Sequence, residues 1–447
     1  MKESLYNISK YYKDDLYWIY NTLTTSLIFM STREYEDVFV NHHYSNDNHD
    51  IDELYQLGFL IDEDYDEKKY LRELREDVVN ATHKIADMMV APTMDCNAHC
   101  YYCFEHGCHH EKMTTETADA LIDYITQNWN HDLFSISWFG GEPLLAPDII
   151  DYITAGLKRN DVNFISRIVT NGSLLSEEIV RKALYEWNTV KTQVTIDAIG
   201  EEYNRIKNYT KGFSDNPYEL VLSNVEKALT AGLRVRIRIN FNPIKQSSAK
   251  DLMECLESQF GKFQNFDSYF APIDADSSIV PPIAGEFPDR EHPWLSLIHF
   301  SQRYGYFHGN ERGTDGNFLG DSEGILTNLK IYPSPTNCYA SCPHVFAVDS
   351  KGDLYKCHRV LGKGGAYSSG NIKTGVIKND IYNFFSDTSL TLKECEDCKV
   401  LPICQGGCKI NAYIYKDEHA CCPARSVMPE LIEEYIKIAK EKRVIHI

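Results

Sequence analysis

Three cysteines in the first quarter of the chain have a spacing that suits metal chemistry. Cys96, Cys100 and Cys103 form the pattern CxxxCxxC, and Tyr102 stands directly before the third thiol. Three thiolates can hold three irons of a four-iron cubane, which leaves one iron open to a substrate or cofactor. The same spacing could instead hold zinc, completed by one of the nearby histidines His99, His106 and His109.

A second, denser group of thiols lies in the last quarter of the chain. Its core is CxxCxxxxxCxxxC, from Cys395 to Cys408, and GxxxxC precedes it at residues 352–357. Two fully ligated four-iron clusters need eight thiolates, so this group is large enough for two of them. A pair of structural zinc sites remains an alternative. The nine cysteines are Cys338, Cys342, Cys357, Cys395, Cys398, Cys404, Cys408, Cys421 and Cys422.

Polar residues also follow several apolar, strand-like runs. Glu142 stands in a Gly-Gly-Glu-Pro sequence after the run 134–138, and its carboxylate could accept from an ammonium group. The paired glycines permit close approach of the backbone to a ligand. Asp197 and Asn240 end two later runs, although either could simply cap an element. Thr170-Asn-Gly172 ends another, and alone it would more often be a plain turn.

The elements that must position these groups alternate between strand and helix. Strands are expected at residues 88–92, 134–138, 165–170, 193–197, 235–240 and 269–273, with helices at 115–129, 177–185, 218–231 and 249–260. Such alternation predicts a parallel sheet. We therefore expect an α/β fold, a partial (β/α)6 TIM-like barrel, with the polar groups gathered at the carboxyl ends of its strands.

Over roughly residues 88–275 these motifs resemble the radical S-adenosylmethionine (SAM) superfamily. The resemblance implies that Cys96, Cys100 and Cys103 hold a [4Fe–4S] cluster whose open iron binds SAM. It implies that one electron cleaves SAM to a 5′-deoxyadenosyl radical, which abstracts a hydrogen atom from the substrate. The SAM contacts expected from it are Tyr102, Gly140, Gly141, Glu142, Pro143, Thr170, Asn171, Asp197 and Asn240.

Residues 338–422 are similar to the SPASM domain, a C-terminal extension of peptide-modifying radical SAM enzymes. The similarity implies two auxiliary clusters, and so three [4Fe–4S] clusters in all. One would be held by Cys338, Cys342, Cys357 and Cys408. The other would be held by Cys395, Cys398, Cys404 and Cys422, with Cys421 as the alternative to Cys422. Cys108, Cys255 and one of Cys421 and Cys422 are left over, and Cys255, on the apolar stripe of a helix, is expected in the protein core.

The first 85 residues contain no cysteine and read as two strands (17–20 and 26–30), helices at 32–40 and 50–57, and a strand at 58–61. A longer helix is expected at 68–88. Ser31 and Glu34 form a capping box for the first helix. This order resembles the winged-helix-like peptide-recognition modules of peptide maturases, which pair a leader peptide along a strand edge. The expected domains are residues 1–85, 86–275, an irregular bridge at 276–332, and 333–447.

The net charge and the lack of long apolar runs limit which classes of partner and location are expected. The net charge is −20, which argues against nucleic acid. We see no membrane-spanning run and no signal peptide, so a cytoplasmic location is expected, where thiols stay reduced. The resemblance to radical SAM enzymes implies an oxygen-sensitive oxidoreductase that receives electrons from a flavodoxin- or ferredoxin-type donor.

Two branches of the family compete for the substrate. The favoured prediction is a maturase of a ribosomally made precursor peptide that carries a leader sequence and receives a cysteine thioether crosslink. The alternative is an anaerobic sulfatase-maturating, formylglycine-forming enzyme, in which an Asp follows the GxxxxC cysteine; here that position is His358. A non-catalytic electron carrier or zinc scaffold is a third reading. No catalytic base is assigned, although His358, Asp349 and Tyr355 lie near Cys357 in the sequence.

Overall fold

The computed structural model describes residues 1–45, 50–80, 84–129, 132–242, 245–273, 332–334, 338–387, 393–415 and 424–441. The chain divides into two compact units. One contains residues 1–81, 319–341 and 387–447, and the other contains residues 82–318 and 342–386. The predicted bridge lies outside the described residues except for Tyr332. The four predicted domains stay a prediction.

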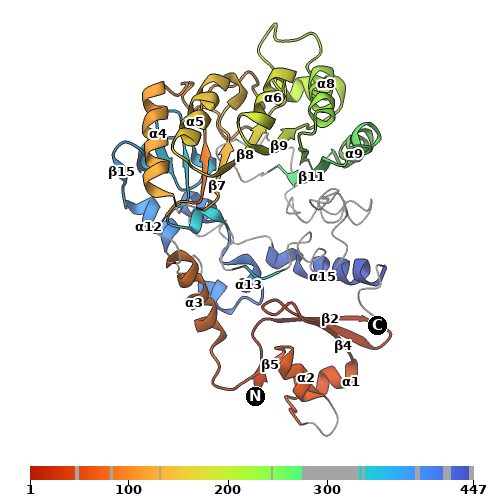
Figure 1. Cartoon of the computed structure of the whole chain (residues 1–447). Helices are drawn as coiled ribbons and strands as arrows, with labels where there is room; N and C mark the ends of the chain where they lie inside the picture. The colour runs from red at the N-terminus through yellow and green to blue at the C-terminus, as the bar shows by residue number, and fades with distance from the viewer. Residues whose placement is uncertain are drawn as a thin grey trace. The chain divides into compact units, whose positions relative to one another are not determined.

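The larger unit is built on one sheet in which six parallel strands follow one another in chain order (Figure 1). Several strands alternate buried and less buried residues, as in Phe134–Trp138, and the buried side chains of the sheet are mostly Ile, Val, Phe and Trp. This confirms the predicted α/β fold with a mostly parallel sheet. The strands are β6 (Asp87–Val90), β7 (Phe134–Trp138), β8 (Phe164–Thr170), β9 (Thr189–Thr195), β10 (Val235–Phe241) and β11 (Phe266–Pro272).

Helices connect these strands and bury one apolar stripe each. Thr114, Ser176 and Asn216 cap three of them by accepting from a backbone N–H three residues on. Four were expected from the sequence, and α5 and α7 were not among them. The helices are α4 (Thr115–Asn128), α5 (Pro147–Arg159), α6 (Glu177–Tyr185), α7 (Gly200–Lys207), α8 (Pro217–Thr230) and α9 (Gln246–Phe260).

Residues from the cysteine-rich region extend this same sheet. Strand β12 (Phe346–Val348) pairs in parallel with β6, and β13 (Asp353–Tyr355) pairs antiparallel with β12. Strands β14 (Ser368–Asn371) and β15 (Gly375–Val376) complete the ten-stranded sheet, followed by α12 (Asp380–Ser386). The hairpin of β12 and β13 therefore carries Cys357 on a backbone that is continuous with the sheet.

The smaller unit contains a three-stranded antiparallel sheet of β2 (Asn7–Lys13), β3 (Leu16–Asn21) and β4 (Leu27–Ser31). The capping box is present: the Ser31 side chain accepts from the Glu34 N–H, and the Glu34 carboxylate accepts from the Ser31 N–H. Strand β2 was not predicted. The predicted helix at 32–40 is α1 (Thr32–Tyr35) followed by a π-helical turn, η1 (Glu36–Val40).

The remaining elements complete this unit. Helix α2 (Ile51–Gln56) leads to β5 (Leu60–Ile61), which pairs with β1 (Lys2–Glu3). Helix α3 (Glu67–Asn80) is shorter than predicted, because residues 87 and 88 already belong to β6. One face of the three-stranded sheet packs on Val38, Phe39 and Leu54.

The C-terminal helix α15 (Ala424–Glu441) belongs to this unit as well. The Lys10 ammonium lies 2.8 Å from the Glu433 carboxylate, and the Lys440 ammonium lies 4.9 Å from the centre of the Tyr12 ring. A small core of Tyr6, Leu71 and Leu401 joins the first residues of the chain to the cysteine-rich turns. The two ends of the chain therefore stabilise one another within a single unit.

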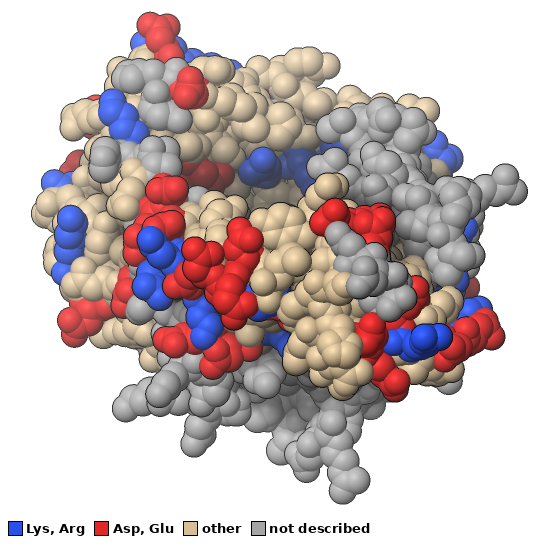
Figure 2. Space-filling view, turned by 90° about the horizontal axis from the view of Figure 1, so that it is seen from below, with Lys and Arg blue, Asp and Glu red and all other residues tan. Residues whose placement is uncertain are grey.

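The surface and the helices bear on possible partners. Figure 2 shows several groups of Asp and Glu residues on the viewed face, with Lys and Arg among them, in keeping with the net charge of −20. Within the described part of the chain, no helix is both long and apolar enough to span a bilayer.

Candidate iron–sulfur and SAM site

The cysteines of the first motif lie on a loop between β6 and α4. Backbone contacts close the base of this loop: the Met113 N–H donates to the Pro92 carbonyl at 2.9 Å, and the Met94 N–H donates to the Glu111 carbonyl at 3.0 Å. Cys96, Cys100 and Cys103 are each half-buried on it. Burial raises the pKa of Cys103 to about 12, with smaller contributions from Glu105 and the neighbouring Cys100.

The three thiols therefore lie within electrostatic range of one another, and as a donor set they fit the ligands of a site-open cubane. Among the residues that the structure describes, no three His, Cys, Asp or Glu side chains are grouped as a metal site.

The tip of the loop is anchored by backbone and amide contacts. Ala98 forms an antiparallel bridge with Tyr209. The Asn97 carbonyl accepts from the Thr210 N–H at 2.9 Å, and its side-chain oxygen accepts from the Asn171 amide at 2.8 Å. The loop is thus held from the end of β8 and from the connection between α7 and α8. Asn97 was not anticipated from the sequence, because its role depends on these distant partners.

The paired glycines pack against the cluster loop itself. A Cβ atom on Gly141 would lie 2.1 Å from the Asp95 carbonyl oxygen, and one on Gly140 would lie 2.4 Å from the Thr93 carbonyl oxygen. Gly140 also has a positive φ of 102°, which other residues rarely adopt. The sequence suggested that the glycines let a ligand approach. In the structure their absent side chains let two stretches of backbone meet, which sets the position of the loop.

Glu142 follows these glycines and is fully buried. Its Oε1 accepts from the Leu144 N–H at 3.0 Å and from the Thr170 hydroxyl at 2.7 Å. Its Oε2 accepts from the Asn171 N–H at 2.8 Å. Burial raises the pKa of Glu142 to about 7, although these three donors act in the opposite direction. A carboxylate has about four acceptor positions, so one on Oε2 remains for a cation.

The predicted contact residues at the strand ends therefore have different surroundings. Thr170 and Asn171 support Glu142 directly. Pro143 is buried and begins the short 3₁₀ helix η2 (Pro143–Leu145). Thr170 and Asn171 thus orient the Glu142 carboxylate. Direct contact of Thr170, Asn171 or Pro143 with SAM stays a prediction.

A second group of polar residues lies at the ends of β9 and β10. The Tyr102 hydroxyl donates to Asp197 at 2.6 Å, and the Asn240 amide donates to the other Asp197 oxygen at 2.8 Å. The Lys207 ammonium lies 2.9 Å from Asp197 and donates to the Tyr102 hydroxyl at 3.1 Å. The structure thus brings together three predicted residues and adds Lys207, which the sequence did not indicate because α7 was not predicted.

A cavity of about 190 Å³ opens beside this group. It is lined by Tyr102, Asp197 and Asn240, and by charged side chains of α7 and of the start of α9. The charged lining residues are Glu202, Arg205 and Lys245. With three thiols on one loop and a buried carboxylate with one acceptor position left, the residues present fit a [4Fe–4S] cluster with SAM beside it.

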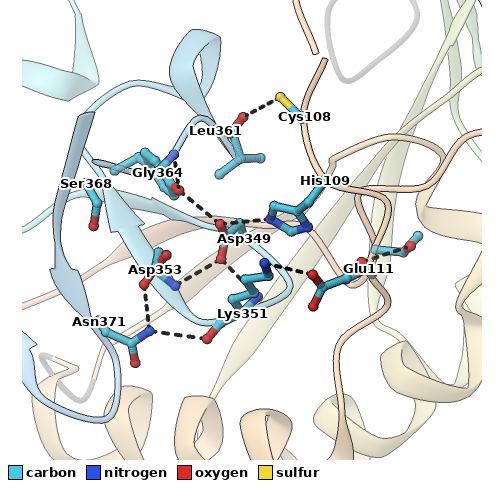
Figure 3. A network of polar contacts seen from close by, with 12 residues as sticks. Cys108, His109, Glu111, Asp349, Lys351, Asp353, Leu361, Gly364, Ser368 and Asn371 are labelled. Carbon is cyan, nitrogen blue, oxygen red and sulfur yellow. Dashed lines mark hydrogen bonds and ion pairs between the residues drawn. The ribbon is translucent and has the colours of Figure 1, made fainter. Parts of the chain in front are cut away.

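The outgoing arm of the cluster loop is fastened to the turn between β12 and β13 (Figure 3). Asp349 is buried and accepts from the Tyr355 hydroxyl at 3.0 Å, and His109 lies 3.4 Å away. The Lys351 ammonium lies 2.7 Å from Glu111. Asp349 and Tyr355 are therefore hydrogen-bonded to one another, in a network that joins the β12–β13 turn to the cluster loop. This arrangement indicates a structural role rather than that of a base.

His358 has different surroundings from those two residues. Its ring centre lies 5.9 Å from that of Phe104 on the cluster loop and 5.5 Å from that of Phe139 at the end of β7. Burial lowers the pKa of His358 to about 4, with smaller contributions from Arg359 and Arg238. The side chain is therefore a neutral imidazole near pH 7, next to the cluster loop.

The C-terminal cysteines are distributed over both units. Cys342 and Cys357 belong to the larger unit, whereas Cys338, Cys395, Cys398, Cys404 and Cys408 belong to the smaller one. Cys421 and Cys422 lie outside the described residues. From Cys395 to Cys408 the backbone is a series of short turns, with Gly406 and Gly407 at φ values of 87° and 85°. The two auxiliary ligand sets stay predictions.

Cys108 and Cys255, which were assigned to no cluster, lie elsewhere in the larger unit. Cys108 is buried and its thiol donates to the Leu361 carbonyl at 3.3 Å (Figure 3). Cys255, on α9, is half-buried with its sulfur 4.0 Å from the Tyr218 hydroxyl. Cys255 is thus less buried than expected.

Comparison with known proteins agrees with this geometry. Residues 90–257 match the model of the radical SAM superfamily, and this range contains the cluster loop and the strands from β7 to β10. A probable GTP 3′,8-cyclase of Methanococcus aeolicus is 31% identical over 160 residues, or 35% of this chain and 50% of the relative. One of Methanococcus maripaludis strain C6 is 28% identical over 232 residues, or 52% of this chain and 66% of the relative. The chain thus spans between half and two thirds of the length of these curated relatives.

Two solved structures share the fold over a greater length. anSMEcpe with bound AdoMet and the Cp18Cys peptide has a TM-score of 0.58 and 20% identity, and covers 80% of this chain and 97% of its own. Streptococcus suis SuiB has a TM-score of 0.53 and 14% identity, and covers 94% of this chain and 100% of its own. At these identities the likeness shows the fold alone.

Proposed function

We propose that this radical SAM enzyme is a peptide maturase that abstracts hydrogen from a ribosomally made precursor peptide and closes a cysteine thioether. The observation that carries the proposal is the N-terminal sheet, a module outside the radical SAM match at residues 90–257. A structure that shares the fold across 94% of this chain, and another solved with a peptide, support it.

SAM and the cluster supply the hydrogen-abstracting radical when they are bound. Around them, Glu142 would hold the SAM ammonium, and the glycine contacts would keep the cluster loop in register with β7. Thioether formation removes two hydrogens from the peptide. One leaves as a hydrogen atom and becomes part of 5′-deoxyadenosine. The other would leave the cysteine thiol as a proton, and the remaining electron would need an acceptor. An auxiliary cluster held by the predicted C-terminal cysteines would supply that acceptor.

Leader binding is proposed at β4, which is one edge of the three-stranded sheet in the described part of the chain. Exposed strand edges bind extended peptides through their backbone groups. Lysines on an edge discourage such pairing. The other edge strand, β2, contains Lys10 and Lys13, whereas β4 has the uncharged sequence LIFMS. The leader would therefore add a strand beside β4.

Leader binding at β4 can be tested by comparison with β2, the other edge strand of the same sheet. Amide hydrogen exchange of residues 27–31 should slow when the leader peptide is added to the full chain, and exchange of residues 7–13 should not change. The full precursor should bind at least about tenfold more tightly than its leaderless core peptide. Equal affinity for the two peptides, or protection of residues 7–13 instead, would contradict leader recognition at β4. Deletion of residues 1–81 is less informative, because Tyr6 and Leu71 pack on Leu401.

The formylglycine-forming alternative is kept because of His358. A neutral imidazole beside the cluster loop can accept a proton, which is the role that the resemblance implies for the Asp at this position in that branch. That reading predicts turnover of a short Ser- or Cys-containing sulfatase peptide with no leader. The GTP cyclases match up to 52% of this chain, so their substrate is not carried over.

A further inference from the structure

Lys207 is almost completely removed from solvent, with 2% of its side chain exposed. Lysines are rarely buried unless their charge is paired, because the desolvation of an ammonium group costs several kcal/mol. Here the partner is Asp197, whose side chain is 4% exposed. Removal of either charge would leave the other buried without its partner, which would be strongly destabilising.

The Lys207 ammonium group contacts Tyr102 of the cluster loop as well as Asp197. It donates to the Tyr102 hydroxyl at 3.1 Å, and that hydroxyl donates to Asp197 at 2.6 Å. It also lies 5.8 Å from the Tyr102 ring centre and 5.7 Å from the Tyr203 ring centre, distances at which a cation is attracted to the ring face. Tyr102 is therefore fixed by a charge from α7 and a carboxylate that follows β9.

The backbone of Lys207 reaches the same loop. Its carbonyl accepts from the His99 N–H at 2.8 Å, one residue before Cys100. Lys207 therefore contacts the residue before Cys100 through its backbone and the residue before Cys103 through its side chain. Burial lowers the pKa of Lys207, but the groups facing it, led by the Asp197 carboxylate at 2.9 Å, outweigh burial and raise the pKa above its ordinary value. The ammonium stays charged at every pH at which the protein would work.

We propose that Lys207 is a positioning residue whose buried positive charge, held by Asp197 and transmitted through Tyr102, tunes the reduction potential of the cluster held by Cys96, Cys100 and Cys103. This inference rests on the proposed cluster at those thiols. Reduction adds one negative charge to the cluster, so a fixed cation nearby makes reduction easier and a fixed anion makes it harder. Lys207 and Asp197 therefore act with opposite signs.

The test is an anaerobic redox titration of the reconstituted full chain, followed by electron paramagnetic resonance. The signal of this cluster is identified by its change on addition of SAM and is then titrated without SAM. Lys207→Met should lower the ratio of reduced to oxidised cluster at a fixed potential about tenfold, or about 59 mV for one electron. Asp197→Asn should shift the ratio in the opposite direction, and Lys207→Arg should stay near the wild type.

Lys182→Met is the matched control, because it also removes a lysine paired with an aspartate of the larger unit, Asp151, at 2.6 Å. It should leave the titration unchanged. The inference is overturned if Lys207→Met and Asp197→Asn shift the potential in the same direction, or if Lys207→Arg shifts it as much as Lys207→Met. If Lys207→Met does not fold, the sign of the Asp197→Asn shift still decides. Absence of a SAM-responsive signal in the wild type would instead refute the cluster assignment.

Discussion

The two cysteine regions of this protein are supported in different ways. The loop with Cys96, Cys100 and Cys103 is held by α7 and by residues that follow β7 and β8. Among them are Gly141, which packs on Asp95, and the Asn171 amide, which donates to Asn97. The turns from Cys395 to Cys408 are held mainly by hydrogen bonds between near neighbours in sequence and by a small core around Leu401. The fold therefore positions the first loop, and we expect the second region to depend more on the metal that its thiols are predicted to bind.

The largest test of this contrast is removal of the first three thiols. Cys96, Cys100 and Cys103 changed together to Ala should abolish SAM cleavage, because nothing then holds the iron at which SAM binds. About two thirds of the iron should remain if two auxiliary clusters stay bound. Deoxyadenosine assay and iron analysis after anaerobic purification measure both. Persistent SAM cleavage would show that the cluster is assigned to the wrong thiols.

Iron removal should separate the two regions in hydrogen exchange. In the metal-free protein, amides of residues 393–415 should exchange about a hundredfold faster, because metal binding and folding are coupled in turns with little core. Amides of β7, β8 and β10 should change little. Equal loss of protection in both regions would contradict the difference in support.

The glycine contact allows a smaller, local perturbation. Gly141→Ala places a methyl group 2.1 Å from the Asp95 carbonyl, so backbone must move, at a cost of about 3 kcal/mol in the free energy of unfolding. Gly212→Ala is the control: it has a positive φ of 82° but nothing within 4 Å of its Cβ, and should cost about 1 kcal/mol. Denaturant titration of the two variants measures the difference. Equal costs would argue against tight packing of the cluster loop.

The smallest expected effect is on the pH dependence of SAM binding. Glu142 has a raised pKa of about 7, so it is largely neutral at pH 6 and ionised at pH 8. An ammonium group binds the ionised form, so SAM affinity should rise about tenfold between these values. Isothermal titration calorimetry at both pH values, on the wild type and on Glu142→Gln, tests this. A similar rise in the Gln variant would show that another group titrates.

The sequence predicted the parts of this molecule that depend on local pattern. The strands of the parallel sheet, the capping box of Ser31 and Glu34, and the cluster motif are all encoded by short spacings. Strand β2 was missed because its residues, NISKYYK, alternate poorly between apolar and polar. The parallel pairing of β12 with β6 could not be predicted either, because some 250 residues separate the two strands and no local signal records their register.

The site was foreseen in its residues more than in their roles. Glu142 and Asp197 were chosen as SAM contacts, but their supports emerge only from packing: Thr170 and Asn171 for one, Lys207 for the other. In the sequence, Lys207 cannot be distinguished from an ordinary lysine on the surface of a helix. Only the structure shows that Lys207 is buried and paired with Asp197, which follows β9.

The most direct test of the central claim is anaerobic turnover of a small cysteine-containing peptide encoded beside this gene, read by intact mass. The reaction would contain the reconstituted full chain, SAM and a reductant. The proposed function predicts loss of two hydrogens for each modified site, with 5′-deoxyadenosine formed alongside and with leaderless peptide left unmodified. Deoxyadenosine without any change in peptide mass, together with turnover of a leaderless sulfatase peptide, would contradict it.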